Sequence, residues 1–306
     1  MLSWDSVGGT TRGPATWSMN PNVQDEDEAA RRVALTRWNG ARAEALHDVV
    51  AREEPLEIQV RGASLAVLMR TPGHDLELAR GFLLTERIVA AADDIVAVRH
   101  CTVVSDPAAE DNVVTVILRD GLALDLDALR RTLVANASCG VCGKTSIAQA
   151  LAVAAPLDDA SRFAPALFRD LVARLAAAQP VFARTGGLHA AGLFAADGTL
   201  LVAREDIGRH NAVDKIVGWA SEHGRLPLTG HLLMVSGRVS FEIAQKALAA
   251  RIPVVAAVSA PSSLAIELAE SAGLTIVAFL RGDRFNVYGA RQRVFVSPAS
   301  DAKRDQ

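Results

Sequence analysis

The most constraining feature of the sequence is a regular alternation of short apolar runs and helical segments in its second half. Apolar runs at 232–235, 254–258 and 275–280 have the length of buried strands, and residues 241–250 and 264–271 between them have helical periodicity. Strands that alternate with helices of about ten residues are joined by right-handed crossovers and lie parallel in one sheet. The sequence therefore predicts an α/β unit with a largely parallel sheet.

The segments that follow these strands are polar and rich in small residues. They lie at 236–238, 259–263 and 281–284, and the first and the last contain arginine. Ligands of such sheets bind beyond the carboxyl ends of the strands. Arginine side chains and helix N-termini are common partners of phosphate groups. We therefore expect a pocket for a phosphorylated ligand at this edge of the sheet.

A second feature is the pair Cys139 and Cys142, spaced CxxC, with a glycine after each and Lys144 two residues further on. Helix-like segments at 125–134 and 147–153 flank the pair, so we expect a short, pliable loop that opens a helix. Unpaired N–H groups and a nearby cation lower the pKa of a thiol from its free value near ~8.5. A thiolate at neutral pH is a nucleophile, so this loop is where we expect the chemistry.

The first half of the chain predicts a smaller α+β unit. Alternation at 56–69 around Arg61-Gly62 indicates a β-hairpin, Thr71–Asp75 ends it and opens a helix, and strands follow at 95–102 and 113–118. Residues before about 45 have little hydrophobic periodicity and are predicted to form mostly a tail. We divide the chain into a mobile N-terminal tail at 1–45, a small α+β domain at 46–135, the cysteine loop at 136–150 and an α/β cofactor-binding domain at 151–306.

Composition excludes several classes of protein. The chain has 306 residues and a net charge of -3, which implies no general polyanion-binding surface and no nucleic-acid partner. Three cysteines, an odd number, argue against a disulfide scaffold and for a reducing compartment. The N-terminus lacks a basic and apolar signal segment, and no uncharged apolar run reaches ~18 residues. We expect a cytoplasmic protein that does not span a membrane.

The cysteine pair leaves other interpretations open. A structural zinc site needs more ligands than the pair provides, and Cys101 is the one further cysteine. A dithiol redox protein would place the motif directly after a strand, whereas a helix-like segment precedes it here. A phosphate-binding P-loop would need glycine where Ser138 stands. The P-loop therefore fails, while a dithiol redox protein or a zinc-binding guanine-nucleotide-binding module remains the alternative.

Residues 204–215 follow a predicted strand at 200–203 and are dense in ionisable side chains. A solvated helix start, capped by Asp206 or Asn211, would account for them. The mixture also suits a nucleotide, because Asp206 and His210 offer partners for a base or a ribose while the arginines and the lysine offer partners for phosphate. His189, after a double glycine, is in isolation best explained as a loop histidine.

Several motifs together resemble the FdhD family, the sulfurtransferase accessory proteins of formate dehydrogenase. The resemblance runs from about Leu56 to Val294, and the N-terminal tail lies outside it. The chain lacks the signature of a zinc cytidine deaminase, which is His-x-Glu followed later by Pro-Cys-x-x-Cys. His189-Ala190-Ala191 has no glutamate to shuttle protons, and the cysteine pair comes before this histidine. The matching motifs are Ser-Cys-Gly-Val-Cys-Gly-Lys at 138–144, the segment at 204–215, Ser-Gly-Arg-Val-Ser-Phe-Glu at 236–242, Pro-Ser-Ser-Leu-Ala at 261–265 and Phe-Leu-Arg-Gly-Asp-Arg-Phe-Asn-Val-Tyr at 279–288.

The resemblance implies a function and a fold. Such a protein takes persulfide sulfur from a cysteine desulfurase and passes it to the molybdenum cofactor, bound as a substrate in its bis(molybdopterin guanine dinucleotide) form, before insertion into formate dehydrogenase. It also implies a cytidine deaminase-like three-layer α/β core, a homodimer, and no permanent cofactor or metal site. Cys139 should carry the persulfide, with Cys142 assisting. The resemblance places cofactor contacts at Phe279, Leu280, Arg281, Gly282, Asp283 and Arg284. From the strand-end pocket and the segment at 204–215 we expect Arg238, His210 and Asp206 to bind the cofactor as well.

Overall fold

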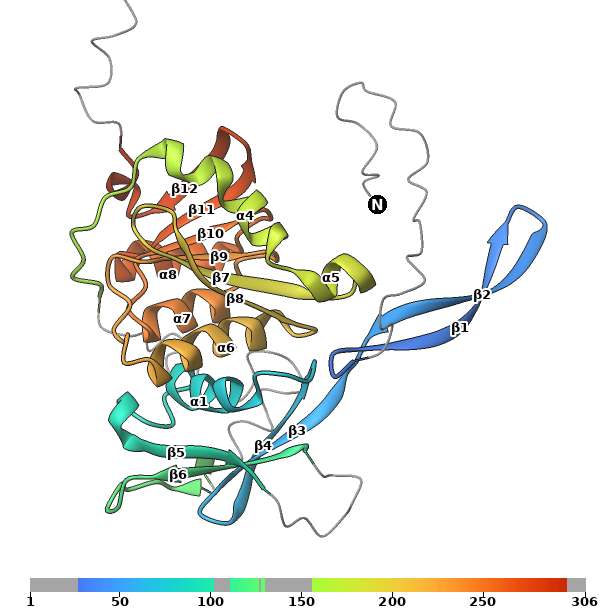
Figure 1. Cartoon of the computed structure of the whole chain (residues 1–306). Coiled ribbons are helices and arrows are strands. Elements are labelled where there is room, and N and C mark those ends of the chain that lie inside the picture. The colour runs from blue at the N-terminus through green and yellow to red at the C-terminus, as the bar shows by residue number, and fades with distance from the viewer. Residues whose placement is uncertain (1–26, 102–110, 127, 130–155, 296–306) are drawn as a thin grey trace, which may run out of the picture.

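A six-stranded sheet forms the centre of the larger unit (Figure 1). The structure is a computed structural model that describes residues 27–101, 111–129 except residue 127, and 156–295. The order of the strands across the sheet is β12-β11-β10-β9-β7-β8. Their bounds are β7 His189–Phe194, β8 Leu200–Asp206, β9 Leu232–Val235, β10 Val254–Ala257, β11 Thr275–Arg281 and β12 Arg284–Gly289.

Helices cover both faces of this sheet. In β10, Val255 and Ala257 pack against one helical layer while Val254 and Ala256 pack against the other, as the alternation of side chains along a strand requires. Both faces are therefore apolar, and the larger unit has the expected three layers. One layer contains α6 (Arg209–Glu222), α7 (Phe241–Ala249) and α8 (Ser263–Ala272), and the other contains a 3-10 helix (Pro165–Asp170) and α4 (Leu171–Ala177).

The sheet is mixed, which corrects the prediction of a largely parallel one. Strands β9, β10 and β11 are parallel, but β7, β8 and β12 run antiparallel to their neighbours. The physical reason is the length of the connections. Gly282 and Asp283 alone join β11 to β12, and so short a link can only reverse the chain. The strands and helices predicted between 232 and 280 are confirmed to within a residue or two.

In the smaller unit, the described residues form a four-stranded sheet on which helix α1 packs. The predicted hairpin, the helix after it and the two later strands are confirmed. Leu56, Ile58 and Leu78 are fully buried between the sheet and the helix. The order is β4-β3-β6-β5, and the elements are β3 Glu54–Val60, β4 Ala63–Arg70, α1 Asp75–Thr85, a 3-10 helix at Ala92–Asp94, β5 Ile95–His100 and β6 Val113–Leu118.

Helices α1 and α6 join the two units by an unusually close crossing. A Cβ atom added to Gly81 would lie 1.8 Å from the backbone oxygen of Asp214, and one added to Gly218 would lie 1.8 Å from that of Glu77. No side chain fits at either position, so the two glycines let the helix backbones touch. This contact fixes the smaller unit against the face of the larger unit that carries α6.

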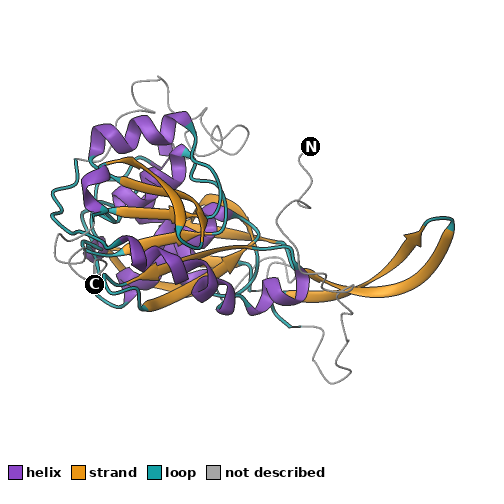
Figure 2. Ribbon diagram, turned by 90° about the horizontal axis from the view of Figure 1, so that it is seen from above, coloured by secondary structure: helices purple, strands orange, loops and turns teal. Residues whose placement is uncertain are grey.

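A long β-hairpin precedes the smaller unit and projects from the body (Figures 1 and 2). It consists of β1 (Ala30–Asn39) and β2 (Arg42–Ala51), joined by a two-residue turn in which Gly40 has a φ of 59°. The prediction of a mobile tail up to residue 45 is therefore wrong for residues 30–45, because ten backbone pairs order the chain there. Residues 1–26 lie outside the described part.

The remaining elements close the larger unit. The short helix α5 (Pro180–Thr185) lies between α4 and β7, and a 3-10 helix at Arg291–Arg293 follows β12. Among the described residues, no helix combines the length and the apolar character needed to cross a membrane.

Candidate functional site

The segments that follow β9, β10 and β11 lie side by side, as the sequence predicts. The backbone N–H of Val239 donates to the oxygen of Ala260 over 3.1 Å, and that of Ser262 donates to the oxygen of Val239 over 3.0 Å. The N–H of Phe279 in turn donates to the oxygen of Ser259 over 3.2 Å. These bonds hold the three segments in one row along the carboxyl edge of the parallel strands.

A cavity of about 430 Å³ opens at this edge, between the sheet and the layer of α4 and α5. Its walls are mainly apolar and include Leu175, Phe182 and Met234. The polar side chains on its surface are Gln179, His189 and Ser236, the last directly after β9. Apolar walls with a few polar groups are typical of a site for a small organic ligand.

Helix α5, which forms part of this cavity, is held by a carboxylate. Glu205 of β8 accepts hydrogen bonds from the backbone N–H groups of Val181 over 3.0 Å and Phe182 over 2.7 Å. Burial raises the pKa of Glu205, against the effect of these bonds. This wall of the cavity was not predicted from the sequence. The one signal for it is Pro180, because proline is favoured in the first turn of a helix.

Positive charge gathers where β7 and the segment after β9 meet. A Cβ on Gly237 would lie 3.4 Å from Nδ1 of His189 and 3.8 Å from Cδ of Arg209. Burial, with the charges of Arg209 and Arg238, lowers the pKa of His189, so the ring is neutral at physiological pH. The Nε atom of Arg209 is buried without a hydrogen-bond partner in the described part of the chain. An anion at this point would be stabilised.

The predicted cofactor residues at the hairpin end between β11 and β12 differ in how exposed they are. Phe279 is 43% exposed and has a φ of 57°, a left-handed conformation that is uncommon for a bulky residue. Leu280 is buried in the core. Arg281 donates to the backbone oxygen of Val258 over 2.7 Å, beside the cavity, and lies opposite Arg284 in the strand register.

The turn of this hairpin is tied to the layer of α4. Gly282 has a φ of 57°, which glycine adopts without strain. The carboxylate of Asp283 pairs with Arg169, and both side chains are largely exposed. Asp283 therefore ties the hairpin end to the layer of α4, and Arg281 and Arg284, on either side of the turn, are both exposed.

His210 lies in the first turn of α6, close to the same row of segments. Its Nε2 atom is 3.4 Å from the hydroxyl of Ser240, which precedes α7. Burial and the charges of Arg209 and Lys246 lower the pKa of His210 to about 4. The ring is therefore neutral at physiological pH.

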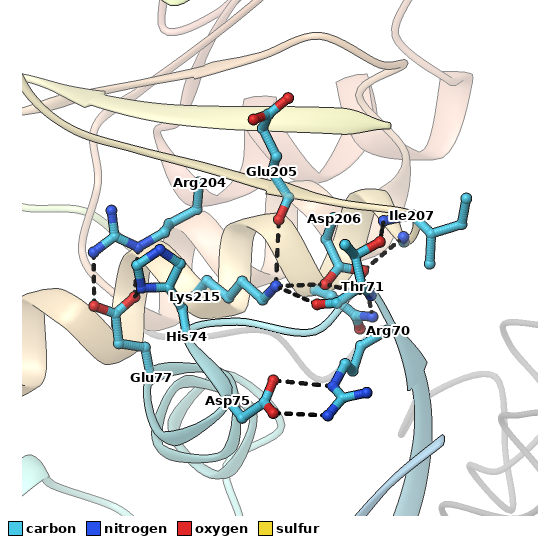
Figure 3. Close-up of polar contacts among 12 residues, drawn as sticks. Arg70, Thr71, His74, Asp75, Glu77, Arg204, Glu205, Asp206, Ile207 and Lys215 are labelled. Carbon is cyan, nitrogen blue, oxygen red and sulfur yellow. Dashed lines mark hydrogen bonds and ion pairs between the residues drawn. The ribbon is translucent and has the colours of Figure 1, made fainter. Parts of the chain in front are cut away.

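Asp206 lies instead at the boundary between the two units (Figure 3). Its carboxylate is fully buried, pairs with Lys215 over 2.8 Å and accepts the backbone N–H of Thr71 over 3.3 Å. Arg204 likewise binds both carboxylate oxygens of Glu77, at 2.6 and 2.7 Å. This geometry favours a structural role for Asp206 over the ligand contact expected from the sequence.

A second buried ion pair lies where α1, α6 and α7 meet. The ammonium group of Lys246 donates to Asp214 over 2.9 Å, to Glu86 over 2.7 Å and to Thr85 over 2.9 Å. Burial alone would lower the pKa of Lys246, but the two carboxylates outweigh it and raise the pKa. The pair joins the two units, and the charge of Lys246 also acts on His210.

The predicted sulfur-carrying residues Cys139 and Cys142 lie outside the described residues, and their roles stay predictions. Within the described ranges, His, Cys, Asp and Glu side chains form no group of three that could hold a metal ion.

The sequence model of the FdhD/NarQ family matches residues 51–295. The chain belongs to the FdhD/NarQ family. The resemblance seen in the sequence motifs is thereby confirmed, and the match begins at the last residue of β2.

Relatives of this FdhD/NarQ protein are called sulfur carrier protein FdhD. The one from Mycolicibacterium paratuberculosis is 49% identical over 270 residues, which cover 87% of this chain and 99% of the relative. The one from Mycobacterium tuberculosis is 51% identical over 254 residues, covering 81% of this chain and 92% of the relative.

A crystal structure supports the fold. It is of a candidate formate dehydrogenase accessory protein from Desulfotalea psychrophila, with a TM-score of 0.69 and 23% identity. The superposition covers 87% of this chain and 100% of that one. The mixed α/β architecture is therefore a known one, and the likeness to cytidine deaminases stays a prediction.

Proposed function

We propose that this protein is a sulfurtransferase that supplies the molybdenum cofactor of formate dehydrogenase with sulfur. It takes persulfide sulfur from a cysteine desulfurase and transfers it to the cofactor in its bis(molybdopterin guanine dinucleotide) form, before insertion of the cofactor into the enzyme. Membership of the family and the name of the relatives, sulfur carrier protein, support the transfer of sulfur.

The observation that carries the proposed acceptor is the end of the β11–β12 hairpin. Arg281 and Arg284 lie directly opposite each other there, and like charges in that position destabilise a strand pair. A bound phosphate group would remove the repulsion. Phe279 beside them adopts a left-handed conformation that costs about 1–3 kcal/mol, and such conformations cluster at ligand sites. Both features are expected of a site built for an anionic ligand with a ring.

The cavity next to this hairpin suits the ring of a guanine nucleotide. Its apolar walls would contact the flat faces of the base, and Gln179, His189 and Ser236 would bond to its polar edge. The phosphates would then lie toward Arg281, Arg284 and Arg238. Because burial and the neighbouring arginines keep His189 neutral, its ring can both donate and accept a hydrogen bond.

The sulfur step itself is assigned to Cys139. Its thiolate attacks the terminal sulfur of the donor's persulfide, a new S–S bond forms, and the donor cysteine leaves as a thiolate. Cys139 then carries the transferable sulfur as a persulfide. Cys142 would attack the inner sulfur of this persulfide during delivery, which forms a Cys139–Cys142 disulfide and releases the outer sulfur to the acceptor at the oxidation level of sulfide; a thiol reductant reopens the disulfide.

The acceptor site can be tested with GDP as the probe. We expect GDP to raise the melting temperature of the wild-type protein and to leave that of Arg284→Ala unchanged. Arg291→Ala is the matched control, since Arg291 is an exposed arginine that follows the far end of β12, away from Arg284 and the hairpin turn. The proposal for the acceptor is contradicted if GDP has no effect on the wild type or stabilises Arg284→Ala equally.

The complete function is tested in a bacterium that lacks its own sulfur carrier for formate dehydrogenase. The wild-type gene should restore formate dehydrogenase activity, and Cys139→Ala should not, although the variant protein accumulates to the same level. Restored activity with Cys139→Ala would contradict the assignment. Turnover of disulfides without any desulfurase would favour a dithiol redox protein instead.

A further inference from the structure

Helix α5 carries an aromatic ring that lines the cavity and is only partly covered. Phe182 forms part of the cavity wall, and 43% of its surface is exposed. An isolated apolar residue at the surface needs no explanation, but one that borders an apolar cavity is in a position to touch a ligand. The flat face of a phenylalanine is a surface on which a planar ring can stack.

The helix that carries this ring is weakly held by its own packing. It spans the six residues Pro180–Thr185, and none of them is buried. A helix of this length is far too short to be stable by itself in water. The place of Phe182 therefore depends on what fixes the helix from outside.

The carboxylate of Glu205 satisfies the amide hydrogens that the first turn of α5 leaves free. Pro180 has no N–H, and the next N–H groups, of Val181 and Phe182, donate to the carboxylate over 3.0 and 2.7 Å. The N–H after these donates to the backbone oxygen of Gln179 within the helix. One side chain thus binds the start of the helix, including the backbone of Phe182 itself.

Glu205 is in turn fixed on the sheet. It is the last but one residue of β8 and lies opposite Ala190 of β7 in the strand register. Its backbone oxygen accepts from Lys215 over 3.3 Å, while its carboxylate points away from the ion pairs between the units (Figure 3). The carboxylate is therefore a rigid link between the sheet and the cavity wall.

We propose that Phe182 stacks on the base of the bound nucleotide and that Glu205 is the positioning residue that holds Phe182 in place. This inference rests on the proposed function, in which a guanine end of the cofactor occupies the cavity. It divides the work of the site between two elements. Helix α5 binds the base, and the arginines at the β11–β12 hairpin bind the phosphates.

Substitution of Glu205 by glutamine keeps the size of the side chain and removes half of the link. A glutamine has one acceptor oxygen, and its NH2 group cannot accept the second N–H of α5. The variant should therefore loosen α5 without opening a cavity in the core. Hydrogen exchange followed by mass spectrometry should show faster exchange at Val181 and Phe182 in Glu205→Gln than in the wild type, both without ligand. Equal exchange would overturn the role of Glu205.

The role of Phe182 is tested by isothermal titration calorimetry of the full-length protein with GDP. We expect Phe182→Ala and Glu205→Gln each to weaken binding by about fivefold or more, as for the loss of a stacked base, and Phe182→Tyr, which keeps the ring, to bind like the wild type. The control is Glu270→Gln, at an exposed carboxylate on α8 in the opposite layer, which should not change the affinity.

The double variant Phe182→Ala/Glu205→Gln separates positioning from a general structural role. If Glu205 acts through Phe182, the second substitution should weaken binding little beyond Phe182→Ala alone, whereas independent effects would multiply. A double variant with the full product of both losses overturns the inference, as does a Phe182→Ala protein that binds GDP like the wild type. A wild type without affinity for GDP contradicts the proposed acceptor, and the inference falls with it.

Discussion

Replacing Gly218 by alanine tests whether the crossing of α1 and α6 joins the two units as tightly as the structure indicates. The new Cβ would lie 1.8 Å from the backbone oxygen of Glu77, whereas ordinary contacts of a Cβ begin at 3.4 Å. The helices would have to separate by more than an ångström, because backbone atoms cannot rotate away as a side chain can. Overpacking of a core costs about 1–3 kcal/mol, and a clash with backbone belongs at the upper end.

Alanine also stabilises a helix by about 1 kcal/mol relative to glycine. The net loss of unfolding free energy should therefore be about 2 kcal/mol. That loss corresponds to a melting temperature lower by roughly 4–8 °C. Differential scanning calorimetry measures it, and Gly187→Ala is the control, since the nearest atom to its Cβ would lie at an ordinary 3.6 Å. A Gly218→Ala protein that melts with the wild type would refute the close contact.

Three further predictions concern buried and strained groups. Lys246→Met leaves the buried carboxylate of Asp214 without its partner and should lower the free energy of unfolding by about 3–5 kcal/mol, measured by chemical denaturation. Arg169→Ala, which removes an exposed ion pair, should barely change the denaturation midpoint. Equal midpoints for the two variants would contradict this. Because burial and nearby cations lower the pKa of His210 from 6.5 to about 4, the unfolded chain binds a proton between these pH values that the folded chain does not. Stability should therefore fall as the pH decreases from 6.5 to 4, by up to about 3 kcal/mol, and less in His210→Gln than in the control His223→Gln; identical pH profiles would argue against a buried neutral ring. Phe279→Gly should raise stability by about 1 kcal/mol through relief of the left-handed conformation, yet reduce the thermal shift with GDP, and a loss of stability would count against strain at this position.

The repeating units of the larger domain could be predicted from the sequence because their apolar runs are buried on both faces. The strand expected at 254–258 is β10, Val254–Ala257, and the helix expected at 264–271 is α8, Ser263–Ala272. An apolar run indicates burial but carries no direction. For that reason the antiparallel course of β7 and β12 could not be predicted from the same pattern.

The β1–β2 hairpin was not predicted from the sequence, because neither of its faces is buried. Residues such as Thr36 and Ala45 are exposed on a ribbon that packs on nothing along most of its length, so the sequence lacks the apolar alternation of a half-buried strand. The signal that was available is the Asn39-Gly40 pair at the turn.

The role of Asp206 could not be predicted from the many ionisable residues next to it in the sequence. A carboxylate that binds a ligand and one that joins two units look alike in a sequence. The deciding partner, Thr71, is 135 residues away and reaches Asp206 only after the chain has folded. The row of segments at the strand ends was predictable because the carboxyl ends of parallel strands share an edge, but the cavity wall from α5 depends on packing.

The central claim, transfer of sulfur through a cysteine persulfide, is tested most directly by intact-mass spectrometry after incubation with a cysteine desulfurase and cysteine. The account predicts a mass increase of one sulfur atom on the wild type and on Cys142→Ala, reversed by a thiol reductant, and no increase on Cys139→Ala. An adduct that persists in Cys139→Ala and disappears in Cys142→Ala, or no adduct on any of the three proteins, would contradict it.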